Sequence, residues 1–233
     1  MNRFSVIIPT RDRPGYLREA VDSVLGQSFE NFELIIVNDG TTKIAPFRDG
    51  RACVLDNGGR GAVPARNLGI RAATGDVIAF LDDDDRWIDV DHLHVADAAF
   101  GNGAEFCFAN GIMQFPGDAK PRNFSQGANA LSLEKDNTIL ISAVCYRRSL
   151  HRALGEFDET LPYYWDWDWY LRVARAGIGL QHMVRAAVDI RIHPQNMSGA
   201  DNALAREENL TRFAKKHEIG PLKLKNHADF ASS

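Results

Sequence analysis

The sequence has 233 residues, of which 45% are hydrophobic and 25% are charged, as is typical of a globular chain with a substantial core. The formal net charge of −4 argues against nucleic acid as the main partner, because phosphate binding needs a basic surface. The three cysteines are widely spaced and include no C-x-x-C pair, which excludes a disulfide framework or a structural zinc site.

Short apolar runs alternate with helical patterns through the first half of the chain. The runs at residues 5–8, 34–37 and 77–81 are continuous, as expected for strands that are covered on both faces of a parallel sheet. Helical periodicity predicts a helix that starts near Pro14 and a second helix over 65–73. Strand, helix and strand in repetition predict an α/β fold, namely a three-layer α/β/α sandwich with a mostly parallel central sheet.

The second half of the chain is less regular. Its predicted strands are 106–109, 139–146 and 187–192, and its predicted helices are 165–176 and a surface-exposed helix over 203–217. Residues 111–135 are rich in Gly, Pro, Asn and Ser, which predicts a long loop or hairpin of the kind that often binds ligands. Neither an internal repeat nor a linker is visible, so we expect a single domain over 1–233.

Polar residues gather where three predicted strands end. They lie at 9–13, 38–41 and 82–86, directly after the three long apolar runs. Ligands of parallel α/β sheets bind in the crevice beyond the carboxyl ends of the strands. The sequence therefore predicts a site at this edge of the sheet.

Four consecutive carboxylates, Asp82 to Asp85, follow the third apolar run. Adjacent like charges repel one another, and a hard divalent ion such as Mg²⁺ or Mn²⁺ prefers oxygen ligands and bridges well to phosphates. Asp82 and Asp84 form a D-x-D pair on one side of an extended segment. The alternative is a solvated acidic turn that caps the next helix, but the position at a strand end favours a metal site.

Four stretches of the chain resemble the family-2 glycosyltransferases, which are inverting enzymes of the GT-A fold. They are VIIPTRDRP (6–14) with 20–28 and 32–41, ARNLGI (65–70) with TGDVIAFLDDDD (74–85), GEFDE (155–159) with DWDWYLR (166–172), and RIHP (191–194) with Ser198. Each stretch is weak evidence alone, but all four occur in the family's order over about residues 4 to 198. The resemblance implies a Rossmann-like GT-A domain.

The resemblance also implies the nucleotide site. Its residues would be Pro9, Thr10, Arg11, Asp39, Arg66, Asp82 and Asp83. Asp39 matches the position that accepts a hydrogen bond from the nucleotide base, and an Asx turn with Gly40 is the structural alternative. Arg66 matches an arginine near the donor, with an ion pair on a helix face as the alternative.

The metal and the general base follow from the same resemblance. Asp84 would be the direct ligand of Mn²⁺ or Mg²⁺, and His193 matches a histidine that reaches the metal or the pyrophosphate in some relatives, with a structural role as the alternative. Asp166 matches the general base, which the chemistry requires because an acceptor hydroxyl must lose its proton as it attacks. Asp168 is the rival for that role, and a helix N-cap is the structural alternative for Asp166.

Aromatic residues surround the proposed base. Trp165 stands where many family members have Glu, which weakens the assignment of the base. We expect Trp165 and Trp167 to contact the acceptor, since aromatic rings stack on sugar rings. The alternative is that Trp167 and Tyr170 are core residues.

The resemblance as a whole implies an inverting hexosyltransferase. It would move a sugar from a nucleotide-diphosphate-sugar donor, with UDP preferred, to a hydroxyl of a saccharide or lipid-linked acceptor, as in polysaccharide biosynthesis. Residues 1–110 would bind the nucleotide-sugar, 111–200 the acceptor, and 201–233 would form a helical tail. The alternatives are a non-catalytic nucleotide-sugar-binding protein and a sugar nucleotidyltransferase, although 9–13 lacks the glycine-rich loop that the latter needs.

The start of the chain shows no secretory signal, and its longest apolar stretches, such as 139–146, fall short of the roughly 18 residues that cross a bilayer. We therefore expect a cytoplasmic protein. The basic residues of the tail offer peripheral contact with anionic lipid at the inner face of the membrane, but a solvated helix is the favoured interpretation. These residues are Arg206, Arg212, Lys215, Lys216, Lys223 and Lys225.

Overall fold

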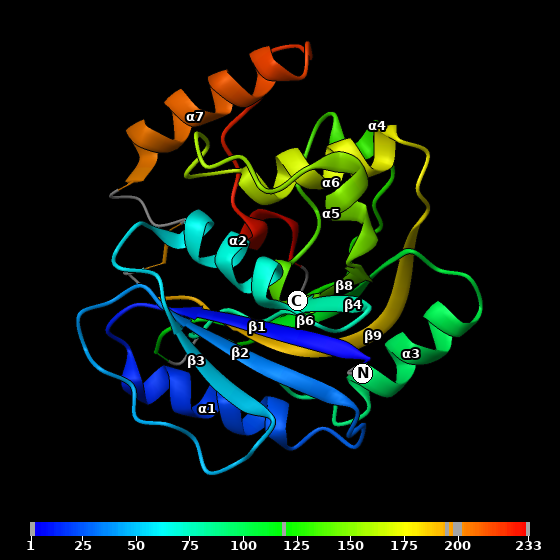
Figure 1. The fold of residues 1–233 in the computed structure, drawn as a ribbon. Helices are drawn as coiled ribbons and strands as arrows, with labels where there is room; N and C mark the ends of the chain where they lie inside the picture. The colour runs from blue at the N-terminus through cyan, green and yellow to red at the C-terminus, as the bar shows by residue number, and fades with distance from the viewer. Residues whose placement is uncertain (1–2, 118–119, 194–195, 198–201, 232–233) are drawn as a thin grey trace.

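The computed structural model describes residues 3–117, 120–193, 196–197 and 202–231 (Figure 1). The strands are β1 Phe4–Thr10, β2 Phe32–Asn38, β3 Ala52–Asp56, β4 Val77–Phe80, β5 Arg86–Trp87, β6 Phe106–Gln114, β7 Arg122–Phe124, β8 Val144–Arg147 and β9 Leu180–Arg191. The helices are α1 Pro14–Leu25, α2 Ala62–Ala72, α3 His92–Gly101, α4 Ala130–Leu133, α5 Ser149–Leu154, α6 Trp165–Arg175 and α7 Ala203–Lys216, with 3₁₀ turns η1 Ile141–Ala143 and η3 His227–Phe230. Pro194 and Ser198 of the fourth family-like stretch lie outside the described residues.

The described strands form one mixed sheet in the order β3-β2-β1-β4-β8-β6-β9-β5, with β7 paired to β6. β1 to β4 are mutually parallel. β8 is antiparallel to both β4 and β6, so β6 runs in the direction of β4, and β9 is parallel to β6. Most of the sheet therefore runs one way, which confirms the predicted mostly parallel sheet.

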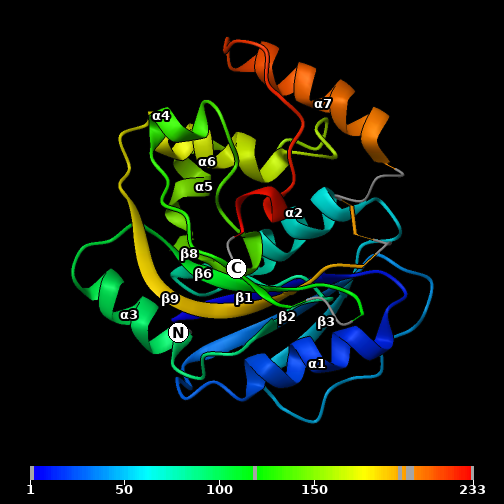
Figure 2. The ribbon, with the colours of Figure 1, turned by 180° about the vertical axis from the view of Figure 1, so that it is seen from behind.

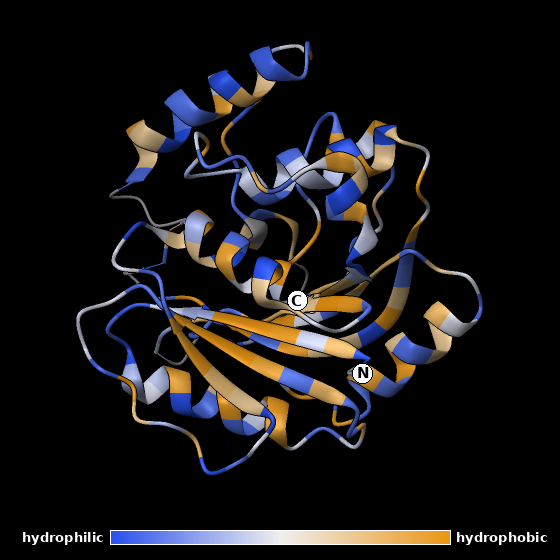
Figure 3. Cartoon of the chain, viewed as in Figure 1, coloured by the Kyte–Doolittle hydropathy of each residue, from blue (hydrophilic) through white to orange (hydrophobic). Residues whose placement is uncertain are grey.

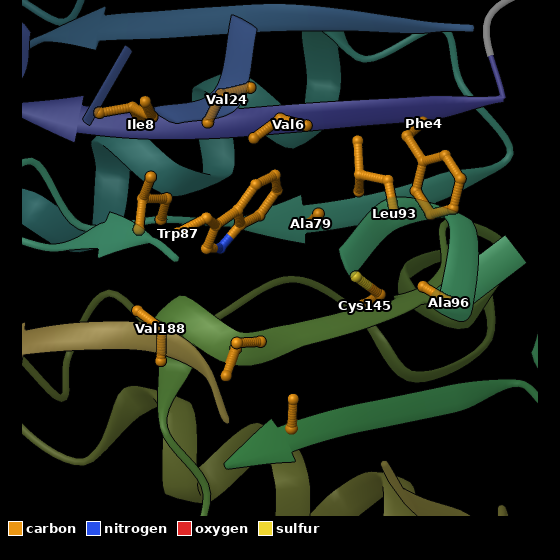
Figure 4. Close-up of a cluster of buried hydrophobic side chains, with 14 of the residues drawn as sticks. Phe4, Val6, Ile8, Val24, Ala79, Trp87, Leu93, Ala96, Cys145 and Val188 are labelled. Atoms are coloured by element: carbon orange, nitrogen blue, oxygen red, sulfur yellow. The ribbon is translucent and has the colours of Figure 1, made fainter. Parts of the chain in front are cut away.

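Helices cover both faces of the sheet. Alternate side chains of β1 point to opposite faces, so Val6 and Ile8 join one apolar cluster and Ile7 joins the other. The first cluster packs against α1 and α3, and Figure 4 shows Trp87 at its centre. The second packs against α2, α6 and α7 on the opposite face, as Figures 1 and 2 show. This arrangement confirms the three-layer sandwich.

The continuous apolar runs form the inner strands. β1 is buried along its whole length, and β1 and β2 are among the most hydrophobic segments of the chain (Figure 3). α2 lies directly on β1 because residue 69 is glycine, since a Cβ there would stand 2.6 Å from Cγ2 of Ile7. The close approach brings the start of α2 to the edge where β1 ends.

Several predicted elements in the second half were wrong in part. The predicted strand 139–146 is a 3₁₀ turn over Ile141–Ala143 followed by β8, because Ser142 turns inward to hydrogen-bond the backbone N–H of Asp82. The segment 111–135, predicted as a long loop or hairpin, does contain the β6–β7 hairpin, but it begins inside β6 and also includes α4. β3, α3 and α5 were not predicted from the sequence.

The helix predicted over 203–217 is present as α7 but is not a surface helix throughout. Leu210 and Phe213 are buried in the second apolar cluster, where Phe213 stacks on Trp167 with ring centroids 4.4 Å apart. No helix among the described residues is long and apolar enough to span a membrane.

Candidate active site

A cavity of about 1010 Å³ opens at the carboxyl ends of β1, β2 and β4. It lies at the edge of the sheet that the polar strand ends predict. All of the predicted site residues line it: Pro9, Thr10, Arg11, Asp39, Arg66, Asp82, Asp83, Asp84, Trp165, Asp166, Trp167 and His193. The fold thus brings together in one cavity residues from both halves of the chain.

Asp39 lines the cavity and is only 4% exposed. Its Oδ1 accepts hydrogen bonds from Nδ2 of Asn57 at 2.5 Å and from the backbone N–H of Gly61 at 2.9 Å, while Nη1 of Arg11 lies 3.9 Å from Oδ2. Two donors on one oxygen fix the orientation of the carboxylate. The Asx turn at this place belongs to Asn38, whose Oδ1 accepts from the N–H of residue 40, so the turn that was the structural alternative for Asp39 is formed by its neighbour.

The acidic cluster divides into two parts. One ligand oxygen each from Asp82, Asp84 and Asp85 lie within 4.8 Å of one another. Asp83 instead accepts a hydrogen bond of 2.7 Å from Oγ1 of Thr10, and burial raises the pKa of Asp83 to about 6. The possible ligands are therefore the first, third and fourth carboxylates of the run.

Asp85 was not among the site residues predicted from the sequence. Its Oδ2 accepts from Oγ of Ser142 at 2.6 Å, and its Oδ1 accepts from the backbone N–H of Arg191 at 3.2 Å. Burial, together with the neighbouring Asp84 and Asp82 carboxylates, raises the pKa of Asp85 well above its ordinary value. Crowded carboxylate oxygens that lack enough positive charge are the donor set that a hard divalent cation fits.

Arg66 neutralises one side of the cluster. It is 5% exposed, pairs with Asp82 through Nη2, and donates from Nη1 to the carbonyl of Ala62 at 3.1 Å. Its guanidinium lies over the ring of Trp165, 4.4 Å from the centroid. Trp165 therefore packs against an arginine of the cavity.

Asp84 is the centre of a second group of donors. Its Oδ2 receives Nη1 of Arg13 at 2.6 Å, Nε2 of His193 at 3.0 Å and Nδ2 of Asn196 at 3.4 Å. The ring of His193 also stacks on Tyr16, with centroids 5.5 Å apart. The histidine predicted near the metal thus contacts the carboxylate predicted as its ligand.

Asp166 is the second residue of α6 and lines the cavity. It is not the N-cap, because Tyr164 holds that position with φ 61°. Its Oδ2 accepts a hydrogen bond of 2.9 Å from Nδ2 of Asn137. Burial raises the pKa of the Asp166 carboxyl, against the lowering effect of backbone hydrogen bonding and of Asn137.

Asp168, the rival base, points elsewhere. It is fully buried and accepts from Arg172 at 3.0 Å, Lys216 at 2.6 Å and His217 at 2.8 Å. Although burial alone would raise the pKa of Asp168, hydrogen bonds from His217 and Lys216 and the charge of Arg172 hold it below its ordinary value. It does not line the cavity and instead joins α6 to α7.

The aromatic residues of α6 are mainly core residues. Trp165 and Trp167 are 6% and 4% exposed, and Nε1 of Trp167 donates to the carbonyl of Leu133 at 2.6 Å. Tyr170 is fully buried. Only small parts of the two tryptophans therefore face the cavity.

The C-terminal segment forms an outer wall of the cavity, which was not predicted from the sequence. Lys223, Lys225 and Phe230 line it, and the segment crosses from α7 back towards the sheet (Figure 2). Nζ of Lys225 lies 2.6 Å from Oδ1 of Asp136, and Nε2 of Gln126 donates to the carbonyl of Phe230 at 3.0 Å. These contacts engage part of the basic tail with the protein itself.

Comparison with known proteins identifies relatives along most of the chain. The family profile described as "Glycosyl transferase family 2" matches residues 5–150. The chain is 29% identical to the uncharacterized glycosyltransferase YwdF of Bacillus subtilis, with 97% of this chain and 88% of that protein covered. It is 30% identical to the uncharacterized glycosyltransferase RP339 of Rickettsia prowazekii, with 91% and 71% covered.

Two solved structures share the fold. TarS 1-349 of S. aureus in complex with UDP-GlcNAc superposes with a TM-score of 0.70 at 19% identity, covering 92% of this chain and 66% of that chain. The mannosyltransferase PcManGT of Pyrobaculum calidifontis, in complex with GDP-Man and Mn²⁺, gives a TM-score of 0.67 at 17% identity, covering 94% and 65%. This chain thus spans about two thirds of those solved chains, and the likeness shows a GT-A-like fold.

Proposed function

Since this chain belongs to glycosyl transferase family 2 and is a glycosyltransferase, we propose that it transfers a sugar from a UDP-sugar donor to a hydroxyl of a saccharide or lipid-linked acceptor, with inversion at the anomeric carbon. The observation that carries the proposal is that the acidic cluster and Asp166 line the same cavity. Residues 1–110 would bind the nucleotide-sugar, 111–200 would bind the acceptor and carry the base, and 201–233 would complete the outer wall.

The donor's nucleotide would occupy the end of the cavity near Asp39. This carboxylate is held by Asn57 through Oδ1, so Oδ2 is the oxygen oriented to accept a hydrogen bond from the base. Pro9, Thr10 and Arg11 line the adjoining wall, where base and ribose would lie. TarS was solved with UDP-GlcNAc and PcManGT with GDP-Man, which supports a nucleotide-sugar donor for this chain as well.

Asp82, Asp84 and Asp85 would hold a divalent cation, with His193 beside Asp84 as a further ligand. The oxygen donor set fits Mn²⁺ or Mg²⁺, and PcManGT was solved with Mn²⁺. A cation bound there would supply positive charge for the leaving nucleoside diphosphate. Asp83 would serve the nucleotide side through its hydrogen bond with Thr10, and Arg66 would add positive charge near the diphosphate.

Asp166 would act as the general base. Its carboxylate takes the proton of the acceptor hydroxyl as the oxygen attacks the anomeric carbon from the face opposite the leaving group. A pKa raised by burial makes the carboxylate a stronger base, and the hydrogen bond from Asn137 holds its orientation. The cavity-facing parts of Trp165 and Trp167 would contact the acceptor sugar.

The proposal is tested with purified protein and a panel of UDP-, GDP- and dTDP-sugars. We expect UDP to raise the melting temperature more with Mn²⁺ than without it, and we expect the preferred donor to release UDP when a saccharide acceptor is added. Pyrophosphate release from a nucleoside triphosphate and a sugar phosphate would instead support a nucleotidyltransferase. If the wild type and Asp166→Asn both bind UDP but neither transfers sugar to any acceptor, the result would support a non-catalytic binding protein.

A further inference from the structure

Two arginines pair with the acidic cluster, and they differ in their surroundings. Arg66 pairs with Asp82, and Arg13 pairs with Asp84 and, at 3.4 Å, with Asp83. When all four carboxylates of 82–85 are ionised, they exceed the two guanidinium charges by the charge of one divalent cation. The two arginines therefore balance part of the negative charge of the proposed metal site. The inference below rests on that proposed site.

Arg13 already pairs with Asp84, the carboxylate proposed to bind the metal. Its hydrogen bond of 2.6 Å to Oδ2 of Asp84 is short and charge-assisted, and it takes one of the lone pairs of that oxygen. His193 and Asn196 approach the same oxygen at 3.0 and 3.4 Å. A cation that binds Asp84 through Oδ2 meets an oxygen that already has three neighbours, and Arg13 among them carries a permanent positive charge.

The Arg13 side chain is more exposed than the Arg66 side chain. The Arg13 side chain is 29% exposed and lines the cavity, and Arg13 is the N-cap residue of α1. The Arg66 side chain is 7% exposed and is held by a carbonyl and by the ring of Trp165. Asp83 offers Arg13 a second carboxylate within reach, and Thr10 keeps that carboxylate in place.

We propose that Arg13 is an exchangeable counter-ion of the metal site, which pairs with Asp84 in the metal-free protein and competes with the divalent cation for this carboxylate. Metal binding moves Arg13 from Asp84 towards Asp83. The metal-free site is thereby kept from accumulating uncompensated negative charge, and the affinity for the metal alone is lowered. Arg13 is a positioning residue in this scheme, because it acts through Asp84.

The test measures Mn²⁺ binding to the nucleotide-free protein by calorimetry. Arg13→Ala removes the competitor, so we expect Mn²⁺ to bind about tenfold more tightly, as the loss of one charge-assisted hydrogen bond to the competing partner implies. Arg11→Ala is the matched control. Arg11 lines the same cavity, but it is 70% exposed and its carboxylate neighbour is Asp39, so this variant should bind Mn²⁺ as the wild type does.

Thermal unfolding gives a second readout. Arg13→Ala should melt below the wild type without metal, because Asp84 loses its partner, and saturating Mn²⁺ should close most of this gap. Arg13→Lys keeps the charge, should fold like the wild type, and should bind Mn²⁺ with an affinity nearer to that of the wild type than to that of Arg13→Ala.

Three results overturn the inference. Unchanged or weaker Mn²⁺ binding by Arg13→Ala would mean that Arg13 supports the ligand instead of competing for it. An equal gain of affinity in Arg11→Ala would mean that only the general charge of the cavity matters. If the wild-type protein binds no Mn²⁺, with or without UDP, the proposed function is wrong in requiring a metal. The first two results would instead contradict only the role of Arg13.

Discussion

Asp166 and Asp168 are separated by one residue, yet their replacement by asparagine should have opposite consequences. In Asp166→Asn the cavity keeps its shape, and the new amide oxygen can still accept from Asn137. The proton acceptor is lost, so transfer should fall by about 10²- to 10⁴-fold. UDP affinity in the presence of Mn²⁺ should stay within about twofold, because the acidic cluster and Asp39 are intact.

The stabilities of the two variants should also differ. Burial raises the pKa of Asp166, so ionisation of this carboxyl is less favourable in the folded than in the unfolded chain, and a neutral amide in its place should leave stability equal or higher. Asp168 has a lowered pKa and therefore contributes stability at pH 7, which Asp168→Asn removes. The side chains of its partners Arg172 and Lys216 are 23% and 36% exposed, so water can solvate these two charges in part once the carboxylate is gone, which reduces the loss of stability. We expect a loss of about 3 kcal/mol, or about 6–12 °C in melting temperature.

The assay combines release of UDP from the preferred donor, calorimetry with UDP and thermal unfolding for both variants. Measured well below its melting temperature, Asp168→Asn should retain most of the wild-type kcat. The reasoning fails if Asp168→Asn abolishes transfer at an unchanged melting temperature while Asp166→Asn remains active, since the base would then be the buried carboxylate.

Further predictions concern neighbouring contacts. Asn137→Ala removes a hydrogen bond that lowers the pKa of the proposed base, so the acid limb of the kcat/KM profile, where activity is lost as pH falls, should move to higher pH; an unmoved limb would contradict this. Asn57→Ala frees the carboxylate of Asp39 and should raise the KM for the donor by about tenfold with little change in kcat, and a fall in kcat alone would speak against a binding role. Gly69→Ala places a methyl group against β1 and should cost about 1–3 kcal/mol in chemical denaturation, whereas Gly15→Ala, with open space around it, should not destabilise.

The layered fold was predictable because its signal is local. β1, β2 and β4 are covered on both faces, so each is a continuous apolar run that the sequence displays directly. β3 has half-exposed and exposed residues at the sheet edge, which removes that signal. The run 139–146 is apolar because it is buried, and burial does not distinguish a strand from the 3₁₀ turn at Ile141–Ala143.

The position of the site was also predictable, but its detailed contacts were not. Parallel strands end at one edge, so the polar segments after them had to meet. The partners that orient the site residues come from distant parts of the chain and carry no local mark. Asn57 contacts a residue 18 positions away, Asn137 one 29 positions away, and Ser142 one 57 positions away.

The sequence by itself determined the order of apolar strands and the chemical types of side chain at their ends, because hydrophobicity and charge are properties of each residue. The tertiary structure alone decided which of two near-identical carboxylates faces the cavity. Two positions along a helix turn a side chain by about 200°, so Asp166 meets the cavity while Asp168 meets Arg172, Lys216 and His217 in the interior. Which side of the helix is solvent and which is core depends on the helices and strands packed around it, and no local pattern records that.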